Sequence, residues 1–158
     1  MFKHKQVSSG TDLAITFIEV LGKTSQRTSE NFEKAFQRVA KLFGKIPRES
    51  AYFDNFKSQA IQWSSTEHKS GHPRLHQLIA YNLWSSKRYS ESRQNFLHSC
   101  DGSGCGQMLV EFHTCKGFAS EVDLFIVNTV LQYLVLRKHV VAAWALKSYT
   151  EKHPSIQR

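Results

Sequence analysis

The sequence has 158 residues and a mass of 18.2 kDa, which fits one domain large enough to bury a core without disulfides or metals. Hydrophobic residues make up 41% and charged residues 22%, so a disordered chain is excluded, and three prolines and eight glycines disfavour a turn-rich β-sandwich or barrel. The formal charge of +8 is spread along the chain, and from it we expect a solvated basic face or an acidic protein partner and no nucleic acid.

Three cysteines, Cys100, Cys105 and Cys115, lie in one short segment and form a poor disulfide framework. They predict reduced thiols and a cytoplasmic (cytosolic) location. The first ten residues lack the apolar segment of a secretory signal. The longest uncharged apolar stretch, residues 124–136, is shorter than the roughly 18 residues that a membrane span requires, so we expect a soluble protein with no membrane insertion of its own.

Apolar residues recur at helical spacing in eight segments of the chain. We expect helices over residues 12–21, 29–43, 47–63, 73–84, 90–97, 108–116, 121–138 and 140–149. Pro47 and Pro73 suit the first turns of the third and fourth helices, and residues 101–104 (Asp-Gly-Ser-Gly) predict a break. Ser120 and Asp123 predict an acidic capping box for the seventh helix, which is apolar nearly all round and is therefore expected to be buried on both sides.

No segment alternates as a strand does, so the predicted fold class is all-α. Helix pairs would start near residues 12, 49, 90 and 121, close to the period of helical-hairpin repeats. We therefore predict an α-solenoid of antiparallel helix hairpins, a tetratricopeptide-like right-handed superhelix. Six residues match the tetratricopeptide spacing, although an ordinary helix hairpin also explains them: Ala80, Leu83, Tyr89, Ser92, Phe96 and Ser99. The expected division is a disordered or remnant N-terminal segment at 1–10, a solenoid domain of about four hairpins at 11–152, and a truncated C-terminal segment at 153–158.

The sequence contains several residues that could bind a metal ion or a phosphate, but their spacing does not fit such a site. A zinc site could draw on five residues, but three of them would face different ways on or near one helix: His98, Cys100, Cys105, His113 and Cys115. His72 and His76 share a helical face but have no third ligand. Gly22-Lys23-Thr24 has Phe17 where a phosphate-binding loop requires glycine. We therefore expect no catalytic, cofactor-binding or metal-binding residues, and no enzyme.

The sequence from residue 60 to residue 156 resembles the Golgi-to-ER traffic protein 4 family. The similarity is carried, in order, by Ala60, Trp63, residues 71–78 (GHPRLHQL), Trp84, residues 91–93 (ESR), residues 96–99 (FLHS), Asp101-Gly102, Gly104-Cys105, residues 108–111 (MLVE), Gly117-Phe118, residues 120–123 (SEVD), residues 130–132 (VLQ), Tyr149-Thr150 and residues 152–156 (KHPSI). Family members have small residues where this chain has Cys100 and Cys115, and they are about twice as long. The chain therefore resembles a family member truncated at both ends.

The resemblance implies a non-enzymatic scaffold in the delivery of tail-anchored membrane proteins to the endoplasmic reticulum. Such a scaffold bridges an ArsA-type targeting ATPase, held by the N-terminal part of the solenoid, to partners held by the C-terminal part. The implied C-terminal partners are a ubiquitin-like co-chaperone and, in animals, a BAG-type scaffold protein. A generic tetratricopeptide-like interaction module is the alternative.

A candidate protein-contact patch is predicted beside the junctions of the third and fourth expected helices. It consists of His72, Arg74, His76, Arg88 and Arg93. Basic side chains arrayed on rigid helices would suit an acidic partner.

Overall fold

A computed structural model of the chain describes residues 3–23, 29–47, 50–65 and 70–156. Across these ranges every regular element is helical, which confirms the all-α prediction. The helices are α1 (Lys3–Lys23), α2 (Ser29–Phe43), α3 (Ala51–Ser64), α4 (Pro73–Ser85), α5 (Tyr89–His98), α6 (Gly102–Lys116), α7 (Val122–Val135) and α8 (His139–Lys152), with a 3-10 turn, η1 (Ala119–Glu121), before α7. No described helix is long and apolar enough to cross a membrane.

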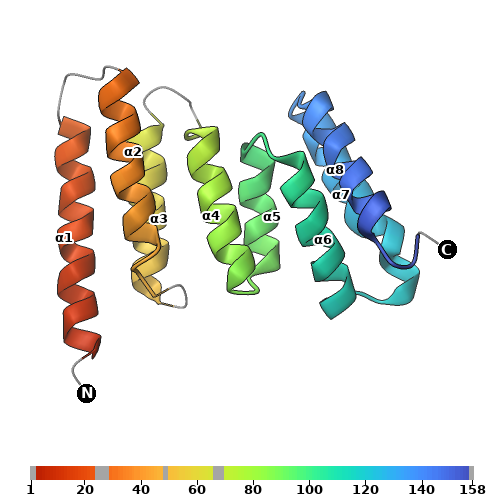
Figure 1. Cartoon of the computed structure of the whole chain (residues 1–158), viewed down its shortest axis with the longest axis horizontal. Coiled ribbons are helices and arrows are strands. Elements are labelled where there is room, and N and C mark those ends of the chain that lie inside the picture. Colours follow the sequence, from red (N-terminus) through yellow and green to blue (C-terminus); the bar gives the residue numbers. More distant parts are fainter. Residues whose placement is uncertain (1–2, 24–28, 48–49, 66–69, 157–158) are drawn as a thin grey trace.

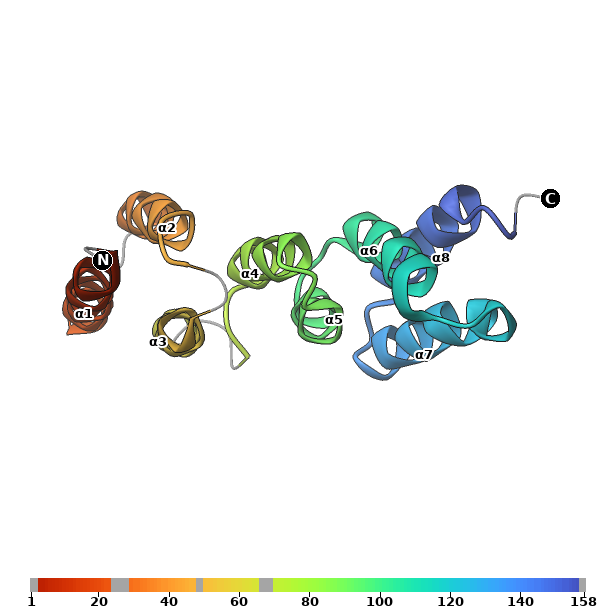
Figure 2. The same cartoon turned by 90° about the horizontal axis from the view of Figure 1, so that it is seen from below.

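The helices stand side by side in a row, with the two chain ends at opposite ends of the molecule (Figure 1). Seen from below, α3, α5 and α7 lie in one layer, while α2, α4, α6 and α8 lie in the other (Figure 2). This is an α-solenoid, as predicted.

The interior consists of two hydrophobic clusters that meet at α4. The first is built on α1 to α4 and includes the fully buried Phe43, Phe53 and Phe56. The second is built on α4 to α8 and includes Tyr133 and Tyr149. Because α4 has apolar residues on two faces, it contributes to both clusters and joins them.

The α4–α5 pair has the close contact that its tetratricopeptide-like spacing predicts. Ser92 is fully buried and its hydroxyl donates to the carbonyl of Ala80 at 2.9 Å. Two small residues at this crossing let the helix backbones approach each other. Phe96 fills the space beside them and is fully buried.

The predicted break between the fifth and sixth helices lies at residues 99–101 rather than at 101–104, because α5 ends at His98 and α6 already begins at Gly102. Asp101 caps it, with Oδ1 accepting from the Gly104 amide at 2.8 Å. Glycine is needed here for packing: a Cβ at Gly106 would lie 2.5 Å from the carbonyl oxygen of Ala145, and one at Gly102 would overlap the carbonyl oxygen of Val141. Gly102, which suggested a loop, and Gly106 therefore form the surface on which α8 packs.

Three predicted helix starts differ from the structure. Helix α1 begins at Lys3 rather than near residue 12, so part of the expected N-terminal segment is helical. Pro47 precedes α3, whose cap is Ser50, with Oγ accepting from the Phe53 amide at 3.3 Å. Before α7 it is Glu121, and not the predicted Ser120–Asp123 pair, that makes the capping bond, because its Oε2 accepts from the Phe118 amide at 3.1 Å.

The prediction that the seventh helix is buried on both sides is also wrong. Helix α7 buries one face through Ile126, Thr129 and Tyr133. The opposite face is exposed, with Leu131 at 56% and Val135 at 83% of full exposure. Hydropathy alone could not show this, because an apolar exposed face has the same composition as a buried one.

The turns after α4 and α7 have the same backbone geometry. Lys87 and Arg137, 50 residues apart, occupy the left-handed region at φ 61° and 58°. In both turns the next amide bonds five residues back, from Arg88 to the Leu83 carbonyl at 3.0 Å and from Lys138 to the Tyr133 carbonyl at 2.9 Å. A left-handed residue followed by an amide that bonds to the carbonyl five residues back is characteristic of the Schellman motif.

Candidate protein-interaction surfaces

The predicted contact patch starts at the beginning of α4, where His72 has a structural role. Its Nδ1 accepts from the Arg74 amide at 3.2 Å and caps the helix. Its ring centroid lies 5.0 Å from that of Phe32, so the imidazole also packs against α2. The side chain is half-buried and positions α4 against the neighbouring hairpin.

Arg74 is the residue of the patch that a partner can reach. Its side chain is 56% exposed, with Nη1 2.7 Å from Glu33 Oε2. The guanidinium lies 4.9 Å above the ring centroid of Phe36. These two contacts link α4 to α2 and hold the guanidinium at the surface in one orientation.

His76 and Arg93 point into the structure. His76 is 4% exposed, with Nδ1 3.0 Å from Asn95 Oδ1 and Nε2 2.6 Å from the Ser70 carbonyl oxygen. Arg93 is partly buried and lines a cavity of about 290 Å³ with Phe112 and Phe125. A buried His76 joins helices and cannot itself contact a partner.

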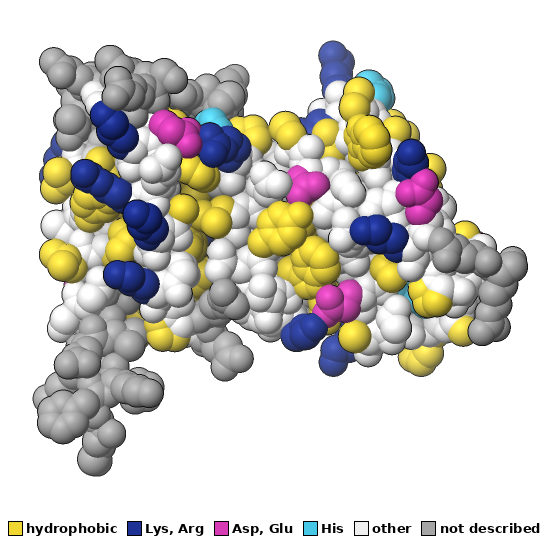
Figure 3. Space-filling model, viewed as in Figure 1, with side chains coloured by type: hydrophobic (Ala, Val, Ile, Leu, Met, Phe, Trp, Pro, Cys, Tyr) yellow, Lys and Arg dark blue, Asp and Glu magenta, His cyan; other side chains and the backbone are white. Residues whose placement is uncertain are grey.

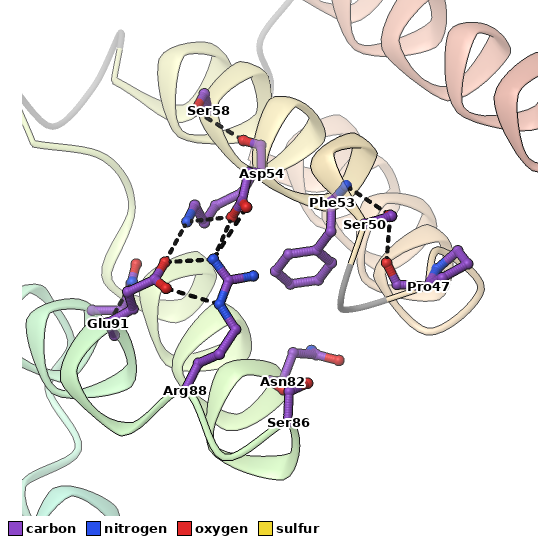
Figure 4. Close-up of polar contacts among 11 residues, drawn as sticks. Pro47, Ser50, Phe53, Asp54, Ser58, Asn82, Ser86, Arg88 and Glu91 are labelled. Carbon is purple, nitrogen blue, oxygen red and sulfur yellow. Dashed lines mark hydrogen bonds and ion pairs between the residues drawn. The ribbon is translucent and has the colours of Figure 1, made fainter.

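Arg88 belongs to a network of four charged side chains that joins α3 to α5 (Figure 4). Its Nη2 lies 2.8 Å from Asp54 Oδ1 and 2.7 Å from Glu91 Oε2. Lys57 bridges the same two carboxylates, at 2.9 Å and 3.2 Å. Hydrogen bonding to Arg88 is the main cause that lowers the pKa of Glu91; the pKa of Asp54 is also lowered, because bonds from Lys57 and Arg88 outweigh burial.

The five predicted residues therefore do not form one continuous patch. His72, Arg74 and His76 lie at the start of α4, whereas Arg88 follows its end, so about 20 Å of helix separates them. The spacing along one helix was visible in the sequence, but the side-chain partners in other helices were not. A binding role for this region stays a prediction that now depends on Arg74.

A second surface, which the sequence analysis missed, lies on α1 and α2. A groove of about 590 Å³ runs between them and is almost entirely apolar, lined by Leu13, Phe17, Val20 and Leu42. Two cations, Arg38 and Lys41, stand at its edge.

Four exposed basic residues on and after α2 extend this edge into a basic stripe, and Figure 3 shows Lys and Arg side chains over this helix. The stripe consists of Lys34, Arg38, Lys41 and Lys45. The separations of four and three residues place Lys34, Arg38 and Lys41 on one face of α2, and Lys45 follows the end of the helix. The helical spacing of these basic residues is visible in the sequence and is the signal from which the stripe could be predicted.

The geometry of the cysteines and histidines does not assemble a metal site. In the described part of the chain, no three His, Cys, Asp or Glu side chains are placed to share a metal ion. Cys105 is buried, which raises the pKa of its thiol to about 12, whereas Cys100 and Cys115 are exposed. Gly22 and Lys23 end α1, and Thr24 of the discounted phosphate-loop motif lies outside the described residues.

A row of stacked helices with an apolar groove and a basic stripe defines the class of protein: an α-solenoid whose surfaces are available for recognition. Comparison with known proteins agrees. The family model for Golgi to ER traffic protein 4 matches residues 1–158, so the chain belongs to that family.

Curated relatives support the assignment. The Golgi to ER traffic protein 4 homologs of Oryzias latipes and Homo sapiens are 44% and 43% identical to this chain, over 99% of its length. The match covers 48% and 47% of those two proteins, so the chain spans about half the length of the curated relatives it matches. A crystal structure of C. therm. Get4 superposes with a TM-score of 0.81 over 93% of this chain and 47% of that one, at 16% identity, which shows the shared fold.

Proposed function

We propose that this protein is a non-enzymatic scaffold in the delivery of tail-anchored membrane proteins to the endoplasmic reticulum, acting in the cytosol. Membership of a family named for traffic between Golgi and ER supports a role in that pathway. The observation that carries the proposed binding role is the α1–α2 groove with its basic stripe. An apolar floor with a cationic edge suits an acidic, partly apolar protein surface.

In this proposal the ArsA-type targeting ATPase docks on α1 and α2. The ubiquitin-like co-chaperone, or in animals the BAG-type scaffold protein, docks on the C-terminal helices. The two sites lie at opposite ends of the row of helices, as bridging requires (Figure 1). Arg74, beside α2, is a candidate for the edge of the ATPase contact.

Binding of the purified 158-residue chain to the purified targeting ATPase tests the proposal. We expect the double substitution Arg38→Glu and Lys41→Glu to weaken binding at least about ten-fold, because each reversed charge would face an acidic partner. The matched control reverses two exposed charges at the far end of the molecule, with Lys147→Glu and Lys152→Glu, and should bind as the unmodified chain does.

Arg74→Glu forms a separate arm of this experiment. A loss of affinity would extend the ATPase contact to the start of α4, whereas an unchanged affinity would remove Arg74 from it. If the unmodified chain fails to bind the ATPase at all, the targeting role is contradicted. A generic tetratricopeptide-like module would then be the better description, and affinity purification from cytosol followed by mass spectrometry would identify its partners.

A further inference from the structure

A cavity between α5, α6 and α7 is lined by an arginine that forms no ion pair with any described carboxylate. The cavity has a volume of about 290 Å³, and the side chain of Arg93 on α5 lines it together with Phe112 on α6 and Phe125 on α7. Figure 2 shows α5 and α7 in one layer and α6 in the other. Neighbouring helices within the row therefore supply the walls of this cavity.

Arg93 lacks hydrogen-bond partners although it is partly buried. Its Nε is shielded from solvent, and no acceptor among the described residues bonds to it. None of the ion pairs in the described part of the chain includes its guanidinium. A shielded N–H group without an acceptor costs free energy, which an incoming acceptor recovers. Arg93 is therefore a preformed donor for an anion, and its planar guanidinium suits the two oxygens of a carboxylate.

Two other titratable groups lie near Arg93, and neither forms an ion pair with it. Glu121 lines the same cavity, but its Oε2 accepts from the Phe118 amide at 3.1 Å, which holds it at the start of α7. The Cys105 thiol is close enough for Arg93 to lower its pKa, yet burial has the larger effect and raises that pKa to about 12, so the thiol stays neutral. The cavity therefore suits one additional carboxylate beside Arg93.

The other walls suit a polypeptide better than a small acid. Phe112 and Phe125 meet edge to face, with ring centroids 5.0 Å apart, and form an apolar surface. Ser90 and Asn128 also line the cavity and are exposed, so their hydroxyl and amide groups can exchange hydrogen bonds with a peptide backbone. A second hollow, of about 440 Å³, shares Ser90 and Phe112 with the first, so a bound segment can continue beyond the cavity.

We propose that this cavity binds an acidic side chain of a partner polypeptide, with Arg93 holding the carboxylate and apolar side chains of the partner against Phe112 and Phe125. Glu121 disfavours a second acidic group here, so the residues next to the acidic one are expected to be uncharged. The site is separate from the α1–α2 groove, and the proposal does not depend on the targeting role.

NMR titration of the purified 158-residue chain with short blocked peptides tests the proposal. The probes are acetyl-Xaa-Glu-Xaa-amides in which each Xaa is Ala, Leu or Phe. For the tightest of them we expect saturable binding with a dissociation constant of about 1 mM, because few atoms make contact. The Arg93 Nε–H signal should move downfield as its hydrogen bond forms. Replacing Glu of the probe by Gln should weaken binding at least about ten-fold.

Substitution of the arginine provides the second arm. Arg93→Gln should weaken binding of the Glu probes at least about ten-fold and abolish the preference for Glu over Gln. Lys147→Gln is the matched control, because it also removes one positive charge, lies on α8 and does not line the cavity. The Arg93 Nε–H signal of the unmodified chain gives the same answer without a substitution, so a variant that fails to fold does not end the test.

Three results would overturn the proposal. They are an Arg93 signal that no probe moves at about 20 mM, equal affinity for the Glu and Gln probes, and unchanged affinity in Arg93→Gln. Sodium propionate, which has the chemistry of an isolated Glu side chain, distinguishes the two sources of carboxylate. Weaker binding of propionate than of the peptides supports a polypeptide ligand, whereas equal binding would assign the cavity to a small acid and contradict the proposal.

Discussion

Two buried histidines tie the residues after α8 to the end of α6. The amide of Ser155 donates to His153 Nδ1 at 3.1 Å, and His153 Nε2 lies 2.8 Å from His113 Nδ1. His113 Nε2 lies 2.9 Å from the Phe118 carbonyl oxygen. All three hydrogen bonds form when each imidazole ring carries its proton on Nε2. A second proton on His153 would occupy Nδ1 and break the hydrogen bond from the Ser155 amide.

This row predicts a loss of stability in mild acid. Burial, and next the proximity of His113, lowers the pKa of His153 below the ordinary value of 6.5, so the unfolded chain binds the proton more readily. The stabilisation is complete above about pH 6.5 and declines as the pH falls through that value towards the lower pKa of the folded state. Burial also lowers the pKa of His98, which acts in the same direction.

Urea unfolding at a series of pH values between 7.5 and 5 checks this. His153→Gln should lower the free energy of unfolding at pH 7.5 by about 1 to 3 kcal/mol and make it vary less with pH. His139→Gln, at an exposed position, is the control and should leave the pH profile unchanged. If His153→Gln leaves the pH profile unaltered, this row of hydrogen bonds is not the cause of the pH dependence of stability.

Side-chain contacts between different helices are difficult to predict from the sequence. The contact patch was proposed from basic residues close in sequence, yet Arg88 is held by Asp54, 34 residues away, and His76 by Asn95. Such pairs depend on how hairpins stack. Local periodicity places a residue on a helical face but does not identify the opposing side chain.

At the scale of elements, the α6–α8 crossing depends on glycine. The shortest approaches are at Gly102 and Gly106, one helical turn apart, where the backbone of α8 occupies the space that a side chain would fill. The sequence predicted the helices on both sides of this segment correctly. It misplaced the start of α6 because glycine is ambiguous between a loop and a close helix contact.

Gly106→Ala should lower the free energy of unfolding by about 1 to 3 kcal/mol, because the new methyl group would force α6 away from Ala145. The same substitution at Gly10 in α1 should raise it by about 0.5 to 1 kcal/mol, because no atom lies within 4 Å of the new Cβ and alanine favours the helix. Thermal and chemical denaturation of the two variants would show opposite signs; equal signs would contradict the packing account.

The charge network between α3 and α5 is the second test at this scale. A double-mutant cycle with Asp54→Ala and Arg88→Ala should give a coupling free energy of about 0.5 to 1 kcal/mol, small because both side chains are partly exposed. The coupling should weaken in 1 M salt, persist at pH 4 and be lost as the pH falls further, since the pKa of Asp54 is lowered from its ordinary value of 3.8 and that of Glu91 is lowered as well. Coupling that is independent of salt would point to packing instead of charge.

At the scale of the whole molecule, two cores in a row predict uneven stability. Phe43 is fully buried and belongs to the first cluster, with its ring 4.8 Å from that of Phe56. Because repeat arrays are stabilised by contacts between neighbours, damage at one end is not transmitted fully to the other.

Phe43→Ala should lower the stability of the first core by about 3 to 5 kcal/mol. Hydrogen exchange followed by mass spectrometry should show faster exchange in α1, α2 and α3 and little change in α6 and α8. Faster exchange throughout the chain would show that the two cores unfold as one unit.

The all-α solenoid was predictable at this scale because helical periodicity and repeat length are local properties of the chain. The exposed face of α7 was not, since its apolar residues have the hydropathy of a buried helix. Whether such a face meets the protein interior or the outside depends on which neighbours are present.

The matching left-handed turns at Lys87 and Arg137 make residues 88–137 a unit whose two ends have interchangeable geometry. The chain therefore uses one backbone solution at two places, and a turn sequence that suits one of them can be exchanged with the other without redirecting the helix that follows.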